Sequence, residues 1–393
     1  IFALILPCTM RYLILLMLVL VTSCVGDARD RLSNSDHEQP FQVAFRTLSR
    51  QYKQEKAAVV DQFFKKYWLS NQVSGAFLVA KNGQIIYEAY KGCGSFERRD
   101  SIKAETPIHI ASVSKVLTAA LIMRLKNEGL IQLDDDVSKY LKPFPYSGMT
   151  VRHLLTHRSG LANYAYLCDE KEIWDKRNRV KNSDVLAIFN KFSIPLQGGI
   201  GKRFAYCNTN YVFLALIAEQ VTQKSYPALM QEYIFGPLGM KHSFVMTDDL
   251  DKEAVCQSYK GNRMRLAFDH LDDTYGDKNI YSTPRDLLLF DKATYSDDFF
   301  TDADKQEIYR GYSYESRGTR NYGIGIRLYE WKTGEKMFYH NGWWHGNTSS
   351  YVTLRKDSVC IIALSNKYSK VPYQSFKLAS VFGNYPIDGE AGE

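Results

Sequence analysis

Segments with the composition of β-strands lie at both ends of this chain, with a helical stretch between them. Residues 76–80 and 84–90 are two such runs, and Asn82-Gly83 between them is the dipeptide typical of a two-residue hairpin turn. Further runs lie between residues 322 and 365, whereas residues 182–247 have the pattern of helices and turns. A sheet assembled from both ends of a chain predicts an α+β fold, in which an antiparallel sheet is flanked by helices and carries a helical insertion.

Local signals place several helices in this framework. Apolar residues recur at steps of three and four from residue 41 to residue 67, which predicts helix there. Residues 208–221 show the same spacing. Thr283 before Pro284 has the pattern of an N-cap followed by proline at the first helical position, so we expect a helix from Pro284 to about residue 293.

We expect one catalytic domain over residues 41–385. Its sheet part would comprise about residues 41–111 and 275–385, and its helical part about residues 112–274.

The first motif with chemical meaning is Ser112-x-x-Lys115, directly before an apolar run that ends at Gly129. A helix that begins here places the two side chains on one face, one turn apart. Unpaired backbone N–H groups at a helix start favour negative charge on the serine oxygen. Apolar neighbours disfavour the charged form of the lysine, which makes it a candidate proton acceptor for the hydroxyl. A capping serine followed by a solvated lysine would give the same pair, so the motif alone decides little.

Two further motifs follow in chain order. Tyr206-x-Asn208 stands just before a predicted helix. A tyrosine can act as a phenolate base where cations lie nearby, and an asparagine amide can donate to and accept from a substrate amide at once. His340-Asn341-Gly342 lies where a strand would end, with a glycine that lets the backbone approach a ligand closely.

With these motifs in this order, residues 41–370 resemble the serine β-lactamase-like, penicillin-recognising superfamily. The resemblance is to its branch of class C β-lactamases, D-Ala-D-Ala carboxypeptidases and esterases, and segments at 153–161, 237–242 and 281–289 are similar as well. It implies Ser112 as nucleophile with Lys115 and Tyr206 as its proton-handling partners. It also implies an oxyanion hole from the backbone N–H groups of Ser112 and Trp343, and these substrate contacts: Asn208, His340, Asn341 and Gly342.

The third motif departs from the class C pattern, which has lysine, threonine and glycine where this chain has His340, Asn341 and Gly342. A neutral imidazole holds a carboxylate more weakly than a lysine, because a charge-assisted hydrogen bond is roughly twice as strong as a neutral one. We therefore expect poor β-lactam hydrolysis. If His340 contacts an anionic group, affinity for carboxylate-bearing substrates should rise as the pH falls through about 6.5.

The function we expect is a serine hydrolase that forms an acyl-enzyme on Ser112 with an amide or ester, most readily a D-Ala-type peptide or a small ester. A class C-type β-lactamase is one alternative, and a catalytically weak cell-wall ligand-binding protein on the same fold is another. The residues leave open which substrate is physiological and whether Lys115 or Tyr206 is the general base.

Composition and spacing argue against several other classes. The 50 basic and 43 acidic residues are scattered without a basic, aromatic-rich patch, so we expect no nucleic-acid partner, and we expect a monomer. His153 and His157 have the spacing of a zinc-protease helix, but Leu154 stands where the glutamate is needed; we expect no metal and no cofactor. No G-x-S-x-G sequence occurs, which argues against an α/β-hydrolase.

The start of the chain predicts export. Met10-Arg11 and the apolar residues 12–21 have the pattern of a signal peptide, and the run is too short for a comfortable membrane span. It ends at Cys24 in a sequence that resembles the lipobox of bacterial lipoproteins. We expect residues 1–23 to be a signal peptide with its true start at Met10, Cys24 to carry a lipid anchor to a bacterial membrane, and residues 24–40 to be a tether. An ordinary cleaved signal peptide is the alternative, and both place the protein in the periplasm or cell envelope.

The cysteines beyond Cys24 do not indicate a disulfide framework. Five are present, an odd number, and no C-x-x-C spacing occurs. One or two bridges are compatible with an oxidising compartment.

Overall fold

The computed structural model describes residues 41, 43–315 and 318–387 of the 393. The predicted signal peptide, the lipobox cysteine Cys24 and the tether lie outside the described residues. The described residues belong to one compact unit. Among the described residues, no helix combines the length and apolar character that a membrane crossing requires.

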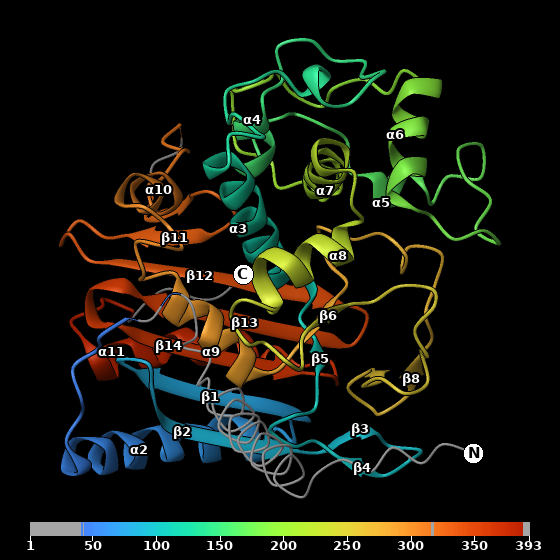
Figure 1. Cartoon of the computed structure of the whole chain (residues 1–393). Helices are drawn as coiled ribbons and strands as arrows, with labels where there is room; N and C mark the ends of the chain where they lie inside the picture. Colours follow the sequence, from blue (N-terminus) through green and yellow to red (C-terminus); the bar gives the residue numbers. More distant parts are fainter. Residues whose placement is uncertain (1–40, 42, 316–317, 388–393) are drawn as a thin grey trace, which may run out of the picture. The chain divides into compact units, whose positions relative to one another are not determined.

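A seven-stranded antiparallel sheet forms the centre of this unit (Figure 1). The N-terminal hairpin lies at one edge and pairs with the last strand of the chain, with Gly75 opposite Ser365 and Lys81 opposite Val359. The predicted turn at Asn82-Gly83 joins the hairpin, and both residues have positive φ. The prediction of an α+β fold with a sheet built from both ends of the chain is confirmed. In spatial order the strands are β10 (Arg320–Tyr322), β11 (Arg327–Glu330), β12 (Lys336–Trp344), β13 (Asn347–Leu354), β14 (Val359–Ser365), β1 (Gly75–Lys81) and β2 (Gln84–Lys91).

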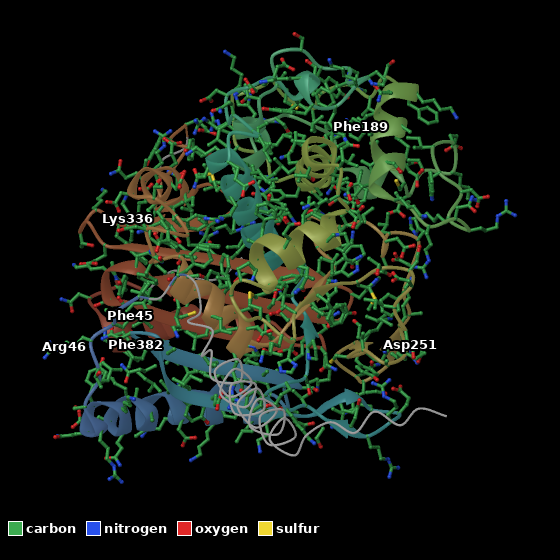
Figure 2. The ribbon with its side chains drawn as sticks, in the orientation of Figure 1. Phe45, Arg46, Phe189, Asp251, Lys336 and Phe382 are labelled. Atoms are coloured by element: carbon green, nitrogen blue, oxygen red, sulfur yellow. The ribbon has the colours of Figure 1, made fainter. Side chains whose placement is uncertain are left out.

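Helices cover both faces of the sheet. Successive strand residues point to opposite faces, so each strand contributes side chains to two separate cores. Ala76 and Leu78 belong to the larger core beneath α3 (Ser114–Asn127) and α9 (Pro284–Ala293). Phe77 and Val79 belong to the smaller core beneath α2 (Arg50–Phe64), η6 (Val371–Leu378) and α11 (Ala379–Phe382). Figure 2 shows the larger core reaching Phe189 in the helical region, whereas Phe382 of the smaller core lies near the sheet.

The helical region between the sheet's two sequence parts packs around α3 and α7 (Figure 1). Most of α3 is fully buried, including Leu117 and Leu121. Burial of such a leucine contributes roughly 1.5–3 kcal/mol, so this helix is a stable platform for residues at its start. The other helical segments are η1 (Lys65–Leu69), η2 (Ala111–Val113), η3 (Val137–Lys139), α4 (Val151–Leu155), α5 (Tyr164–Leu167), α6 (Asn182–Lys191), α7 (Thr209–Thr222), α8 (Tyr226–Met230), η4 (Gln231–Phe235), α10 (Asp302–Ile308) and η5 (Arg355–Asp357).

Three small sheets complete the described fold. One of them, in the order β5-β9-β6, pairs Ile108 and His109 with Ser282 and Tyr281 and so ties the segment before Ser112 to the segment before α9. The short strands are β3 (Cys93–Ser95), β4 (Asp100–Ser101), β5 (Ile108–His109), β6 (Phe244–Val245), β7 (Ser258–Tyr259), β8 (Arg265–Leu266) and β9 (Ile280–Ser282).

Two helix predictions are confirmed and one is wrong in part. Helix α9 begins at Pro284 with the Thr283 side chain accepting from the Asp286 N–H, and α7 covers the predicted segment. The predicted helix from residue 41 begins only at Arg50, after the N-cap Ser49. Before it, Phe41 and Phe45 form edge contacts with aromatic residues near α10, so their helical spacing reflects tertiary packing rather than a helix face.

Candidate active site

Ser112 lies in the 3-10 turn η2, immediately before α3. The preceding Ala111 has φ +49°, a left-handed conformation that costs a non-glycine residue on the order of 1–2 kcal/mol. Its N–H donates to Nδ1 of buried His109 at 3.1 Å, and Nε2 of His109 lies 3.2 Å from Oδ1 of Asn279. Burial lowers the pKa of His109 to about 4, so a neutral imidazole supports this strained turn at neutral pH.

Lys115 lies one helical turn after Ser112 and is completely buried. Its Nζ lies 2.9 Å from Oγ of Ser112 and donates to the Asp277 carbonyl at 2.7 Å. The predicted placement of the two side chains on one face is therefore present. A proton can pass between the two groups without any rearrangement of the backbone.

Tyr206 borders the same two residues from the other side. The centre of its ring lies 5.1 Å from Nζ of Lys115 and 4.9 Å from the guanidinium of Arg327. The ring of His157 packs on it with centroids 4.3 Å apart. A lysine and an arginine thus lie within about 6 Å of the centre of one tyrosine ring, next to the candidate nucleophile.

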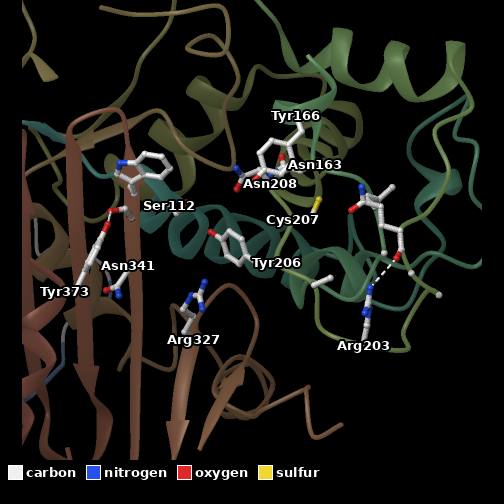
Figure 3. Close-up of a pocket in the computed structure, with 18 residues that line it drawn as sticks. Ser112, Asn163, Tyr166, Arg203, Tyr206, Cys207, Asn208, Arg327, Asn341 and Tyr373 are labelled. Carbon is white, nitrogen blue, oxygen red and sulfur yellow. Dashed lines mark hydrogen bonds between the residues drawn. The ribbon is translucent and has the colours of Figure 1, made fainter. Parts of the chain in front are cut away.

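A cavity of about 410 Å³ opens over Ser112 (Figure 3). It brings together most of the residues predicted from the three motifs. Those that line it are Ser112, Tyr206, Asn208, Asn341, Gly342 and Trp343.

Gly342 allows strand β12 to approach the serine turn closely. A Cβ added there would lie 2.9 Å from the backbone N of Ser112 and 2.6 Å from the carbonyl oxygen of Ile110. The Gly342 carbonyl accepts from the Tyr373 hydroxyl at 3.0 Å, and Ser349 donates to the Ile110 carbonyl at 2.6 Å. This contact brings the backbone of Ser112 next to the strand residues that lead into Trp343, as the predicted oxyanion hole requires.

Asn208 stands at the start of α7 and offers an unused acceptor. Its Oδ1 is shielded from solvent and has no hydrogen-bond partner among the described residues. Its side chain also makes no capping bond to α7. A buried amide oxygen without a donor costs about 1–3 kcal/mol, and a substrate N–H in the cavity would supply that donor.

His340 is the predicted site residue that the structure places elsewhere. It is fully buried, and it is not among the residues that line the cavity. Its Nδ1 lies 2.8 Å from the carbonyl oxygen of Asn341 and its Nε2 lies 3.2 Å from the Tyr322 hydroxyl. Burial first, then the positive charges of Arg327 and Lys115, hold its pKa well below 6.5. The expectation that His340 contacts the substrate and charges near pH 6.5 is therefore corrected: it is a neutral core residue.

Arg327 was not predicted as a site residue, but it is among the residues that line the cavity. It begins β11, pairs in register with Tyr339 one residue before His340, and lines the cavity beside Tyr206. Because burial keeps His340 neutral, the charged side chains that line the cavity in the described part of the chain are Arg203 and Arg327. The sequence signal was a basic residue directly after the apolar Ile326, which gains meaning only once the strand pairing is known.

His157, considered from the sequence only as part of a zinc-protease spacing, contacts the segment that carries Tyr206. Its Nδ1 accepts from the Cys207 N–H at 3.2 Å and from the Asn210 amide at 3.0 Å, while its carbonyl accepts from the Ala205 N–H at 2.8 Å. With its ring on Tyr206, it contacts three consecutive residues, the last two of which belong to the Tyr-x-Asn motif. By contrast, His153 forms a capping box with Thr150 at the start of α4.

The described cysteines are all free thiols, and none lies in a disulfide. Cys207 lines the cavity, but burial raises the pKa of its thiol, which keeps it protonated and unreactive at neutral pH.

Comparison with known proteins agrees with this fold. The family model described as Beta-lactamase matches residues 60–380. The chain is 28% identical over 337 residues to Penicillin-binding protein 4* of Bacillus subtilis, covering 82% of this chain and 74% of that protein. It is 30% identical over 226 residues to the Teichoic acid D-alanine hydrolase of Staphylococcus aureus, covering 56% of this chain and 54% of that protein.

A solved structure shows the same fold. The penicillin binding protein from Bacillus halodurans superposes with a TM-score of 0.72 at 20% sequence identity, covering 82% of this chain and 99% of that one. The fold, the cavity over Ser112 and the family match define a member of the penicillin-recognising group of hydrolases. The chain belongs to the Beta-lactamase family.

Proposed function

We propose that this protein is a serine hydrolase that cleaves an amide or ester through an acyl-enzyme on Ser112. The observation that carries the proposal is the 2.9 Å approach of Lys115 Nζ to Ser112 Oγ at the floor of a cavity shared with Tyr206. A binding protein on the same fold would not need this buried lysine, since burying a charge without a task is costly.

The reaction begins when the Ser112 hydroxyl passes its proton to the Lys115–Tyr206 pair and Oγ attacks the substrate carbonyl carbon. The oxyanion then faces the backbone N–H groups of Ser112 and Trp343, each worth roughly 3 kcal/mol in such sites. Collapse of this intermediate breaks the bond to the leaving group, which takes up the proton. Water then attacks the acyl-enzyme and passes a proton to the Lys115–Tyr206 pair. When the second tetrahedral intermediate collapses, the bond to Ser112 Oγ breaks, Oγ takes that proton back, and the acid is released.

The preferred substrate is a D-Ala-type peptide or a small ester, with efficient β-lactam hydrolysis as the alternative. Arg327, rather than His340, would hold a terminal carboxylate in the cavity, because an arginine keeps its charge at every physiological pH. Two relatives support this substrate class by their names, a penicillin-binding protein and a D-alanine hydrolase. We also propose export with a lipid anchor at Cys24, from the sequence alone, and a monomeric state.

A substrate panel tests the proposal. D-Ala-D-Ala peptides, small esters, D-amino acid amides and β-lactams are each incubated with the wild type and with Ser112→Ala. We expect turnover of the peptides or esters by the wild type alone, with cephalosporin turnover much slower. Rapid turnover of a cephalosporin would favour the β-lactamase alternative, and absence of turnover in every class would favour the ligand-binding alternative.

A further inference from the structure

The cavity continues well past Ser112. Figure 3 shows Ser112 and Arg203 on opposite sides of it, with Tyr206 and Asn208 between them. Arg203 belongs to the loop that leads into Tyr206, and its Nη2 donates to the Gln197 carbonyl at 3.3 Å. A guanidinium therefore borders the end of the cavity that the proposed reaction leaves unused.

Backbone hydrogen bonds fix this loop to the chain before α5. The Gln197 N–H donates to the Gly160 carbonyl at 2.7 Å, and the Gly201 N–H donates to the Arg158 carbonyl at 2.8 Å. A Cβ on Gly160 would lie 2.1 Å from the carbonyl oxygen of Gly198, so the two segments are in close contact. The loop thus presents Arg203 from a defined backbone.

The charges that line the cavity are all of one sign. Arg203 and Arg327 both line it, and no aspartate or glutamate does so within the described part of the chain. The nearby carboxylate of Glu315 forms an ion pair with Arg158 at 3.0 Å and accepts from the Phe204 N–H. Fixed cations in a concave site attract anions and repel cations.

We propose that Arg203 forms a second anion-binding subsite, which holds a carboxylate on the acyl part of the substrate. The proposal rests on the proposed function, because the acyl bond to Ser112 defines the two directions in the cavity. Arg327 receives the leaving-group carboxylate, so the acyl part extends past Asn208 toward Arg203. The guanidinium matches a carboxylate in a two-point hydrogen bond.

The substrate class that follows is an N-acylated D-amino acid derivative with an acidic acyl group. A free α-ammonium group on the acyl residue would find no carboxylate lining this cavity. Leaving that cation without a partner makes a free D-aminoacyl group the poorer substrate.

Two matched probes test the subsite. N-succinyl- and N-butanoyl-D-alanine p-nitrophenyl esters share the reacting bond and differ by one carboxylate. We expect the wild type to favour the succinyl ester about fivefold in kcat/KM, mainly through a lower KM. A preference of about fivefold is the size of effect expected from an exposed ion pair, and it should shrink with added salt. Arg203→Gln should abolish the preference while hydrolysing the butanoyl ester as before. Lys202→Gln removes one charge from the adjacent exposed position outside the cavity lining and should keep the preference.

Equal hydrolysis of the two esters by the wild type, or a preference that survives Arg203→Gln, would overturn the subsite while leaving the proposed function intact. If neither ester reacts, the substrate panel decides the proposed function, and binding decides the subsite separately. In that case the Kd values of N-succinyl- and N-butanoyl-D-alaninamide are measured on Ser112→Ala by calorimetry. A fivefold lower Kd for the succinyl compound that Arg203→Gln removes supports the subsite, and equal Kd values refute it.

Discussion

The Tyr322 hydroxyl lies 3.2 Å from Nε2 of His340 and donates to it, because Nδ1 of the same ring donates to the Asn341 carbonyl. Both ring nitrogens are thus satisfied within the fold in the neutral form. This relationship keeps His340 from contact with a substrate, and Arg327 in the cavity lining is the partner we propose for a substrate carboxylate.

The first prediction concerns whether His340 or Arg327 binds the carboxylate of a substrate. The affinity for a carboxylate-bearing substrate should show no increase between pH 7.5 and 5.5 from His340, because the pKa of that imidazole is held well below this interval. Arg327→Gln should weaken kcat/KM for that substrate roughly tenfold or more and change a neutral ester far less. A rise in affinity through pH 6.5 that disappears in His340→Gln would contradict this assignment.

A second prediction concerns the proton-handling pair. Lys115 and Tyr206 lie next to each other beside Ser112, with Nζ of Lys115 5.1 Å from the centre of the Tyr206 ring. If they act as a unit, Lys115→Ala, Tyr206→Phe and the double variant should lose similar amounts of kcat, because residues in one proton path are not additive. Losses that multiply in the double variant would show that one of the two residues has only a structural role.

His157 allows a third prediction. Its contacts to Ala205, Tyr206 and Cys207 hold the tyrosine in place, so His157→Gln should reduce kcat about tenfold to a hundredfold with little change in KM. His153→Gln is the matched control, because that residue caps α4 four positions earlier. Rates of covalent labelling at Ser112 and melting temperatures of both variants are measured together. Equal activity in the two variants would refute a positioning role for His157.

The fourth prediction concerns pH and stability near the β12–β13 turn. His345 Nε2 lies 3.1 Å from Oδ2 of Asp272, whose side chain is 2% exposed, and Asp269 lies 3.8 Å away. Burial opposes charge on both groups, but their mutual hydrogen bond outweighs it: the pKa of Asp272 falls to about 2 and that of His345 is raised. Lys278, whose charge opposes that of His345, also faces this pair.

The sign of the effect follows from these two shifts. The stabilisation from His345 is complete below its unfolded pKa of about 6.5 and is lost as the pH rises through its higher folded value. The stabilisation from Asp272 is present above about pH 4 and is lost as the pH falls toward 2. His345→Gln should therefore lower the melting temperature at pH 5–6, by roughly 1–2 °C for about 1 kcal/mol in a unit of this size, and have little effect at pH 9. An equal loss at both pH values would contradict an ion-pair origin.

Sequence reasoning reached the elements whose signals are local. Ser112 and Lys115 are three apart at the start of a predicted helix, and Tyr206-x-Asn208 precedes another, so the local pattern made them candidates. Their roles were implied only by the resemblance to a known family. The hairpin at Asn82-Gly83 was predictable for the same reason, since turn chemistry is local.

The remaining features depend on contacts between distant segments. The burial of His340 follows from the packing of Tyr322 and Arg327 against β12, and the role of His157 follows from a loop about fifty residues further along the chain. Likewise, Phe41 and Phe45 have helical spacing but pack on aromatic partners about 250 residues away, so no local pattern could have excluded a helix there.

The most direct test of the central claim is the mass of the acyl-enzyme. The wild-type protein is quenched during turnover of a slow ester or a penicillin and digested with trypsin, and the peptide covering residues 104–115 is fragmented. The account predicts an adduct on Ser112 that disappears with time and is absent from Ser112→Ala. An adduct on another residue, or hydrolysis by Ser112→Ala within about threefold of the wild type, would contradict it.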